Sequence, residues 1–291
     1  MASIVGVHGI WNIKYWTQAS GDLATAQAAI NRDWGRWLAR GLDTQNMAIP
    51  APSSLPVAYY ADCLDRGVPQ GDDPRHLPPF AQELFVQWVA ELRNQRSPGG
   101  KAKESLPLGY STWPVRQAAD WLTRRFGKIS CRVVMALVAE LATYFDPAQA
   151  HRRRAARDRV AEALRMHRPR VLVAHSLGSV VAYEALSRDP GLRLELLVTM
   201  GSPLAMPRVV FDRLDPSPAY GRAAIPSGVP RWINIADIGD PVAVPPGRLR
   251  DFFDRVDDEI TVRIGAFDPH TAKSYLACAQ LAAVLAPYLY A

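Results

Sequence analysis

The sequence contains few cysteines: Cys63, Cys131 and Cys278 are the only three in 291 residues. Their wide spacing matches no metal-binding motif, and an odd, scattered set is typical of free thiols in a reducing compartment. No charged segment followed by an apolar run opens the chain, so we expect no signal peptide. These absences predict a cytoplasmic protein without a disulfide framework or a structural metal.

Long apolar runs are also missing. The most apolar stretch of the central region, residues 133–139, is bracketed by Arg132 and Glu140 and is too short to cross a bilayer. We find no internal repeat and no low-complexity tract. A chain of this length can bury a large core, and we expect a single domain over residues 1–291.

Positive charge exceeds negative charge, with 34 Lys and Arg against 28 Asp and Glu. The densest basic run, residues 151–159, is typical of the solvated face of a helix. Because no recognised nucleic-acid motif accompanies it, we expect no nucleic-acid partner. The run leaves peripheral contact with an anionic membrane open, and the sequence does not set the oligomeric state.

One segment combines an apolar strand with a turn of small residues. Residues 171–174 are apolar, Ser176 stands at the apex of the turn, and helix-forming residues 180–186 follow. Gly178 lets the new helix pass close to the strand. This layout is typical of a nucleophile elbow, in which the N–H of Leu177 faces a developing negative charge. The alternative is an ordinary buried strand, turn and helix.

A serine nucleophile needs a base, usually an imidazole steadied by a carboxylate. Of six histidines, only His270 follows Ser176 in the chain. It lies on a predicted loop between a strand-like run, residues 260–264, and an apolar helix, residues 272–289. We therefore predict that His270 is the general base; the alternative is a surface or helix-capping histidine.

Two aspartates compete for the role of the acid, both after a predicted strand at residues 231–236. We favour Asp240, whose backbone is fixed by the proline that follows it. Asp237 is the alternative, although its position at the end of the strand also suits closure of a turn onto Gly239.

The start of the chain predicts a second feature of such a site. A short strand, residues 3–7, is followed by a His-Gly turn, which commonly presents an oxyanion-hole donor, here the N–H of Ile10. We expect His8 to shape this turn rather than to act as a base. Trp11 and Tyr15 would line a substrate cleft if they face inward.

These segments resemble the α/β-hydrolase superfamily, and within it the lipase-like and esterase-like members. The matching motifs are V-H-G-I at residues 7–10, A-H-S-L-G at 174–178, D-P-V at 240–242, and His270. Alanine replaces the first glycine of the wider G-x-S-x-G pattern, as in small bacterial lipases. The resemblance covers residues 1–60 and 150–291 and implies an α/β-hydrolase fold, a mostly parallel sheet flanked by helices.

The remaining segment, residues 63–150, is predicted to be a helical cap inserted into this domain. Helical patterns occupy residues 80–96, 114–126 and 131–145, with a breaker at 97–100. Such a cap would either pack against the core or form an apolar wall or lid for an acyl chain.

Together these features predict a serine hydrolase that cleaves a carboxylic ester of a small molecule or lipid through an acyl-enzyme, using Ser176, His270 and Asp240 and no metal or organic cofactor. An acyltransferase, a thioesterase or a peptidase could use the same three residues. A catalytically inactive lipid-binding or interaction module is the alternative from another class. The sequence specifies neither the acyl length nor the leaving group.

Overall fold

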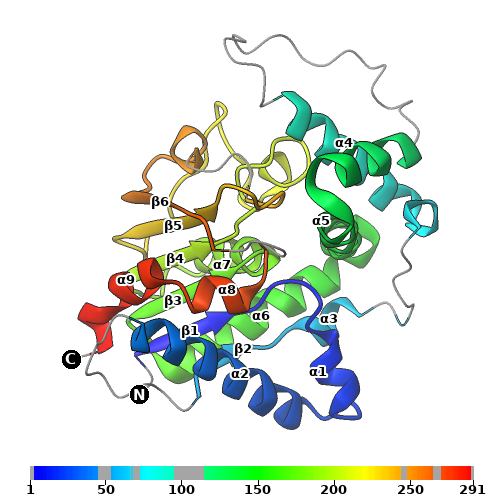
Figure 1. Ribbon diagram of the computed structural model, residues 1–291. Coiled ribbons are helices and arrows are strands. Elements are labelled where there is room, and N and C mark those ends of the chain that lie inside the picture. The colour runs from blue at the N-terminus through cyan, green and yellow to red at the C-terminus, as the bar shows by residue number, and fades with distance from the viewer. Residues whose placement is uncertain are drawn as a thin grey trace.

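Six parallel strands form the centre of the molecule (Figure 1). The computed structural model describes residues 3–44, 54–65, 67, 73–94, 115–243, 248–264 and 270–289. The spatial order of the strands is β2-β1-β3-β4-β5-β6. Their bounds are β1 Ile4–Val7, β2 Val57–Ala58, β3 Val171–His175, β4 Leu196–Met200, β5 Trp232–Asp237 and β6 Asp258–Val262. The predicted α/β class and parallel sheet are therefore confirmed.

Helices cover both faces of this sheet. The side chains of β3 show this, because they alternate between two buried apolar clusters. Val171 and Val173 belong to one buried apolar cluster, and Leu172 and Ala174 belong to the other. Successive side chains of a strand point to opposite faces, so a strand buried on both sides reads as continuously apolar. The first cluster packs under α2 (Leu23–Asp43), α8 (Ala272–Leu276) and α9 (Ala279–Leu289), and the second under α6 (Ala150–His167) and α7 (Leu177–Arg188).

The helix α2 shows how local sequence produces these elements. Asp22 caps its N-terminus by accepting the N–H of Thr25 at 2.8 Å, which satisfies a donor that the helix leaves unpaired. Ile30, Trp34 and Leu38 recur every four residues and are buried against the sheet. In the sequence, residues 22–42 predict an amphipathic helix whose apolar face carries Ile30, Trp34, Trp37 and Leu38. Trp37 is only partly buried, and the other three are confirmed on the buried face.

Two predicted boundaries are wrong. The apolar and aromatic residues 55–60 predict a strand, but the strand is confined to β2, because the N–H of Tyr60 leaves the ladder and donates to the ring of His8. The helix expected at residues 272–289 is divided into α8 and α9. By contrast, the two helices expected at 114–126 and 131–145 are present as the two arms of α5 (Val115–Phe145), which meet at the non-helical residue Gly127.

The predicted cap segment is helical where the structure describes it. It contains α3 (Ala61–Leu64), the 3-10 helix η1 (Pro74–His76), α4 (Pro79–Asn94) and α5. The breaker predicted at residues 97–100 lies outside the described residues. In the described parts of the chain, no helix has the length and apolar character needed to span a membrane.

The basic run on α6 is not simply a solvated face, and that interpretation is wrong for several arginines. Arg153 binds Glu184 of α7, Arg157 binds Asp215, and Arg159 binds Asp62. These ion pairs join α6 to neighbouring segments. Side chains that carry charge are partly buried here because each has an opposite charge within reach.

Candidate active site

Loops that follow β1, β3, β5 and β6 meet at the carboxyl edge of the sheet. From β1 the chain first moves to β2 on one side, and it later returns to place β3 on the other side. The gap between β1 and β3 is therefore a topological switch point, where open parallel sheets bind their ligands. Ser176 directly follows β3, and the His8-Gly9 turn directly follows β1.

Ser176, His270 and Asp240 form a chain of hydrogen bonds at this edge. The Nε2 atom of His270 lies 2.8 Å from Ser176 Oγ, and Nδ1 lies 2.8 Å from Asp240 Oδ2. An ionised carboxylate can only accept, so Nδ1 donates to it and Nε2 accepts the serine O–H. All three side chains are buried. The structure thus brings together three residues that are far apart in the sequence.

The two competing aspartates have different partners. Asp240 Oδ1 accepts the N–H of Val242 at 2.8 Å, which leaves Oδ2 directed at His270. Asp237 Oδ1 accepts the N–H of Gly239 at 2.7 Å and closes the turn after β5. The geometry therefore favours Asp240 over Asp237 as the partner of the imidazole.

Sequence reasoning missed Tyr275, which lies on α8. Its hydroxyl donates to Asp240 Oδ2 at 2.8 Å and accepts the N–H of Asp237 at 2.9 Å. Burial, and then the adjacent Asp240 carboxylate, raises the pKa of Tyr275 well above its ordinary value, so the phenol keeps its proton. No sequence signal marked this residue within the helix predicted at residues 272–289.

The turn that carries Ser176 is strained and closely packed. Ser176 has φ 55° and ψ −131°, a backbone conformation that residues other than glycine rarely adopt. A Cβ on Gly178 would lie 2.3 Å from the carbonyl oxygen of His8, and a Cβ on Gly9 would lie 2.6 Å from Ser176 Cβ. The two glycines thus let the loop after β1 lie directly against the serine.

Three carbonyl groups of that loop are held by side chains. The carbonyl of His8 accepts the Tyr60 hydroxyl at 2.7 Å. Asn12 Nδ2 donates to the carbonyls of Gly9 and Ile10, at 2.9 and 2.8 Å. Because the carbonyls are fixed, the orientation of the intervening N–H groups is fixed as well.

His8 is part of the same scaffold. Its Nδ1 donates to the carbonyl of Gly9 at 2.8 Å, and its Nε2 accepts the N–H of Tyr60 at 3.0 Å. Burial lowers the pKa of His8 to about 4, so the ring stays neutral near neutral pH. These contacts agree with the prediction that His8 shapes the turn.

Two backbone N–H groups beside the serine are available to a ligand. Leu177 is the first residue of α7, where a helix offers no internal acceptor. Within the described parts of the chain, neither its N–H nor that of Ile10 has a hydrogen-bond acceptor. Such donors stabilise negative charge that develops on a bound carbonyl oxygen.

The two residues expected to line a cleft differ in their surroundings. Trp11 is 40% exposed and has φ 63°. Tyr15, in α1 (Ile13–Gln18), is instead buried in the cluster beneath α2, and its hydroxyl donates to Asp33 at 2.6 Å. This packing makes Tyr15 part of the support for α2, so the structure gives no support to its assignment to substrate binding.

The cap segment touches the site from two sides. Glu140 of α5 accepts the N–H of Trp11 at 3.1 Å, and the indole of Trp88 in α4 donates to the carbonyl of Pro241 at 3.0 Å. Burial raises the pKa of Glu140 to about 7. In the sequence, Glu140 was noticed only as the polar end of an apolar run.

The described residues contain no cluster of three or more His, Cys, Asp or Glu side chains that could hold a metal ion. Comparisons of the chain with protein-family models, with curated proteins and with solved structures gave no match.

Proposed function

We propose that the protein is a serine hydrolase of the α/β-hydrolase fold that cleaves a carboxylic ester. The observation that carries this proposal is the pair of 2.8 Å hydrogen bonds from Ser176 through His270 to Asp240. The chain order of serine, acid and histidine, and their place at the carboxyl edge of a parallel sheet, are those of that fold.

In the proposed reaction, Ser176 Oγ attacks the acyl carbon while His270 Nε2 takes its proton. Asp240 stabilises the imidazolium that forms and holds the tautomer that makes Nε2 an acceptor. The N–H groups of Ile10 and Leu177 would bind the oxyanion, each contributing about 3 kcal/mol to a lower barrier. His270 then protonates the leaving alcohol, and water releases the acyl group through the same base.

The proposal assigns α4 and α5 to a cap that shapes the acyl site. Both helices contact loops of the candidate site, through Trp88 and Glu140. Ser176 is 0% exposed. A substrate therefore reaches it only after a neighbouring segment moves, as in enzymes whose lids gate the site.

A cytoplasmic location is part of the same proposal. All three cysteines are free, and two of them are buried. Unpaired thiols support a reducing compartment. The expected substrate is the acyl ester of a small molecule or a lipid.

The decisive experiment compares wild type, Ser176→Ala and Ser187→Ala on p-nitrophenyl esters from acetate to palmitate. Ser187 lies on the same helix, α7, and serves as the matched control. We expect Ser176→Ala to lose hydrolysis and fluorophosphonate labelling, while Ser187→Ala keeps both. Equal turnover by wild type and Ser176→Ala would remove the serine from the mechanism.

The same assay separates the alternatives. Thioester, amide and alcohol-acceptor arms identify a thioesterase, a peptidase or an acyltransferase by the preferred leaving group or acceptor. Absence of labelling at Ser176, with the fold intact, would favour an inactive lipid-binding or interaction module.

A further inference from the structure

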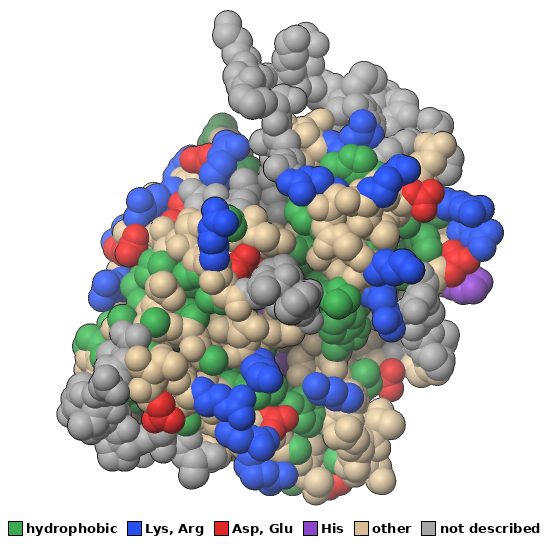
Figure 2. Space-filling view, viewed as in Figure 1, with side chains coloured by type: hydrophobic (Ala, Val, Ile, Leu, Met, Phe, Trp, Pro, Cys, Tyr) green, Lys and Arg blue, Asp and Glu red, His purple; other side chains and the backbone are tan. Residues whose placement is uncertain are grey.

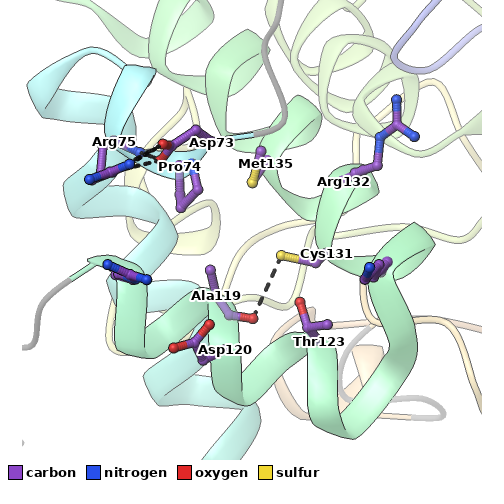
Figure 3. Close-up of a pocket in the computed structure, with 11 residues that line it drawn as sticks. Asp73, Pro74, Arg75, Ala119, Asp120, Thr123, Cys131, Arg132 and Met135 are labelled. Atoms are coloured by element: carbon purple, nitrogen blue, oxygen red, sulfur yellow. Dashed lines mark hydrogen bonds and ion pairs between the residues drawn. The ribbon is translucent and has the colours of Figure 1, made fainter.

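A cavity of about 570 Å³ lies between the two arms of α5 and the helix η1, and Ser176 is not among its lining residues (Figure 3). The arms meet at Gly127, whose φ of 88° and ψ of 165° break the helical path. Across the angle, Cys131 Sγ lies 3.8 Å from the carbonyl oxygen of Ala119. A volume of this size is ordinary for a small-molecule site.

The floor of the cavity is apolar. Ala119 on one arm and Cys131 and Met135 on the other are buried. Cys131 and Met135 are four residues apart and therefore lie on one face of their arm. Pro74 of η1 adds a further apolar wall.

The rim of the cavity is basic. The exposed lining side chains include Arg116 and Lys128, one on each arm, together with Arg75 and Arg132. Figure 2 shows Lys and Arg side chains gathered over the part of the surface where α4 and α5 lie.

Two carboxylates offset only part of this charge. Asp73 pairs with Arg75 at 2.6 Å, and Asp120 is the other acid of the lining. With Arg75 paired and Arg132 left out of the count, Arg116 and Lys128 against Asp120 still leave one positive charge over the apolar floor. Such a field raises the local concentration of anions.

We propose that this cavity binds an organic anion with a compact phosphate or carboxylate head and a short apolar tail. The head lies between Arg116 and Lys128, where Arg and Lys can donate charge-assisted hydrogen bonds to its oxygens. The tail packs on Ala119, Cys131 and Met135. No lining residue belongs to the candidate active site, so this site does not depend on the proposed hydrolase activity.

Calorimetric titration tests the proposal. The ligands are octyl phosphate and octanoate, below their micellar concentrations; inorganic phosphate, which lacks the tail; and octanol, which lacks the charged head. The proteins are wild type, Ser176→Ala, the pocket variant Arg116→Gln with Lys128→Gln, and the control Arg32→Gln with Arg154→Gln. All four arginine and lysine positions are exposed, so these changes spare the core. The control removes the same charge from outside the cavity.

We expect both octyl anions to bind wild type, Ser176→Ala and the control alike, and to bind the pocket variant about tenfold more weakly. Octanol and inorganic phosphate should each bind more weakly than the octyl anions. Three results would each overturn the proposal. Wild type binds neither octyl anion, wild type binds octanol as tightly as the octyl anions, or the pocket variant binds the octyl anions within about twofold of the control.

Discussion

The hydroxyl of Tyr275 and the hydrogen-bonded imidazole nitrogen of His270 are both directed at one oxygen, Oδ2 of Asp240. The orientation of the Tyr275 hydroxyl is fixed, because its oxygen accepts the N–H of Asp237 while its proton is donated to Asp240. The helix α8 is thereby tied to the loop after β5. Tyr275 accordingly acts as a positioning residue for Asp240, and through it for the imidazole.

Replacing Tyr275 by Phe should lower kcat about tenfold with little change in KM. The loss of one hydrogen bond to a charged group costs about 1.5–3 kcal/mol. Part of this cost raises the reaction barrier, because the carboxylate that orients His270 is then held less firmly. Steady-state kinetics on the best p-nitrophenyl ester measures the effect. Tyr288→Phe, a hydroxyl deletion on α9, is the control. Similar kinetics for the two variants would show that Tyr275 only packs.

Asp240 and Asp237 should respond differently to the same substitution. Asp240→Asn should reduce kcat roughly 10³–10⁴-fold, because an amide cannot hold the imidazole tautomer as a carboxylate does. Asp237→Asn should instead destabilise the turn by about 1 kcal/mol and leave kcat within about fivefold of wild type. Kinetics and urea unfolding of both variants distinguish the roles, and the reverse pattern would reassign the acid.

Breaking the ion pair between Arg153 and Glu184 should strongly lower the stability of the fold without changing catalysis. Glu184 is fully buried and also accepts the Tyr144 hydroxyl at 2.7 Å. Glu184 also pairs with Arg157 at 3.5 Å. Removing its charge takes away the buried carboxylate that both arginines face, so Glu184→Gln should lower the free energy of unfolding by about 3–5 kcal/mol.

The control for this prediction is Glu195→Gln, which breaks the solvent-exposed pair with Arg170. Exposed pairs contribute about 0–1 kcal/mol. Urea denaturation monitored by tryptophan fluorescence measures both variants, and kcat under conditions where each is folded should match wild type. Equal destabilisation by the two substitutions would contradict the assigned difference in burial.

Glu140 should make stability depend on pH. Its pKa is about 7 in the folded protein, above its ordinary value, so the unfolded chain releases this proton at lower pH. The contribution of Glu140 to the free energy of unfolding is therefore greatest in acid, falls as pH rises toward about 7, and is constant above it.

Glu140→Gln removes this titration but keeps an acceptor for Trp11. The variant should be more stable than wild type by about 2–3 kcal/mol at about pH 8, and the difference should disappear near pH 4. Urea unfolding across this range measures it, with the exposed Glu162→Gln as control. A difference between wild type and Glu140→Gln that does not change with pH would contradict the prediction.

Much of the architecture was predictable because it depends on local pattern. The apolar run before Ser176 could bury both faces only in the middle of a parallel sheet, and the spacing of Ile30, Trp34 and Leu38 marked the inner face of a helix. The candidate serine and histidine followed from the elbow and from the order of residues in the chain. Asp240 and Asp237 could be ranked, but their partners could not be derived.

Other features depend on contacts that no local pattern encodes. The strand β2 is short because Tyr60 bonds to His8, and Tyr15 is held by Asp33. Arg153, Arg157 and Arg159 of α6 face carboxylates on other segments, whereas the basic run alone suggested solvent.

Residue order and hydrophobic periodicity were thus sufficient to predict a parallel α/β domain and to place a candidate serine at the end of a strand. Only the tertiary structure bonds His270 to Asp240 rather than to Asp237, brings Tyr275 to Asp240 and Glu140 to Trp11, and creates the basic cavity at the bend in α5. Hydrophobic periodicity shows which side of a helix or strand is removed from water, and it can be recognised within a few residues of sequence. Hydrogen bonds and shifted pKa values depend on distances of a few ångströms between remote segments, and those distances exist only once the chain has packed.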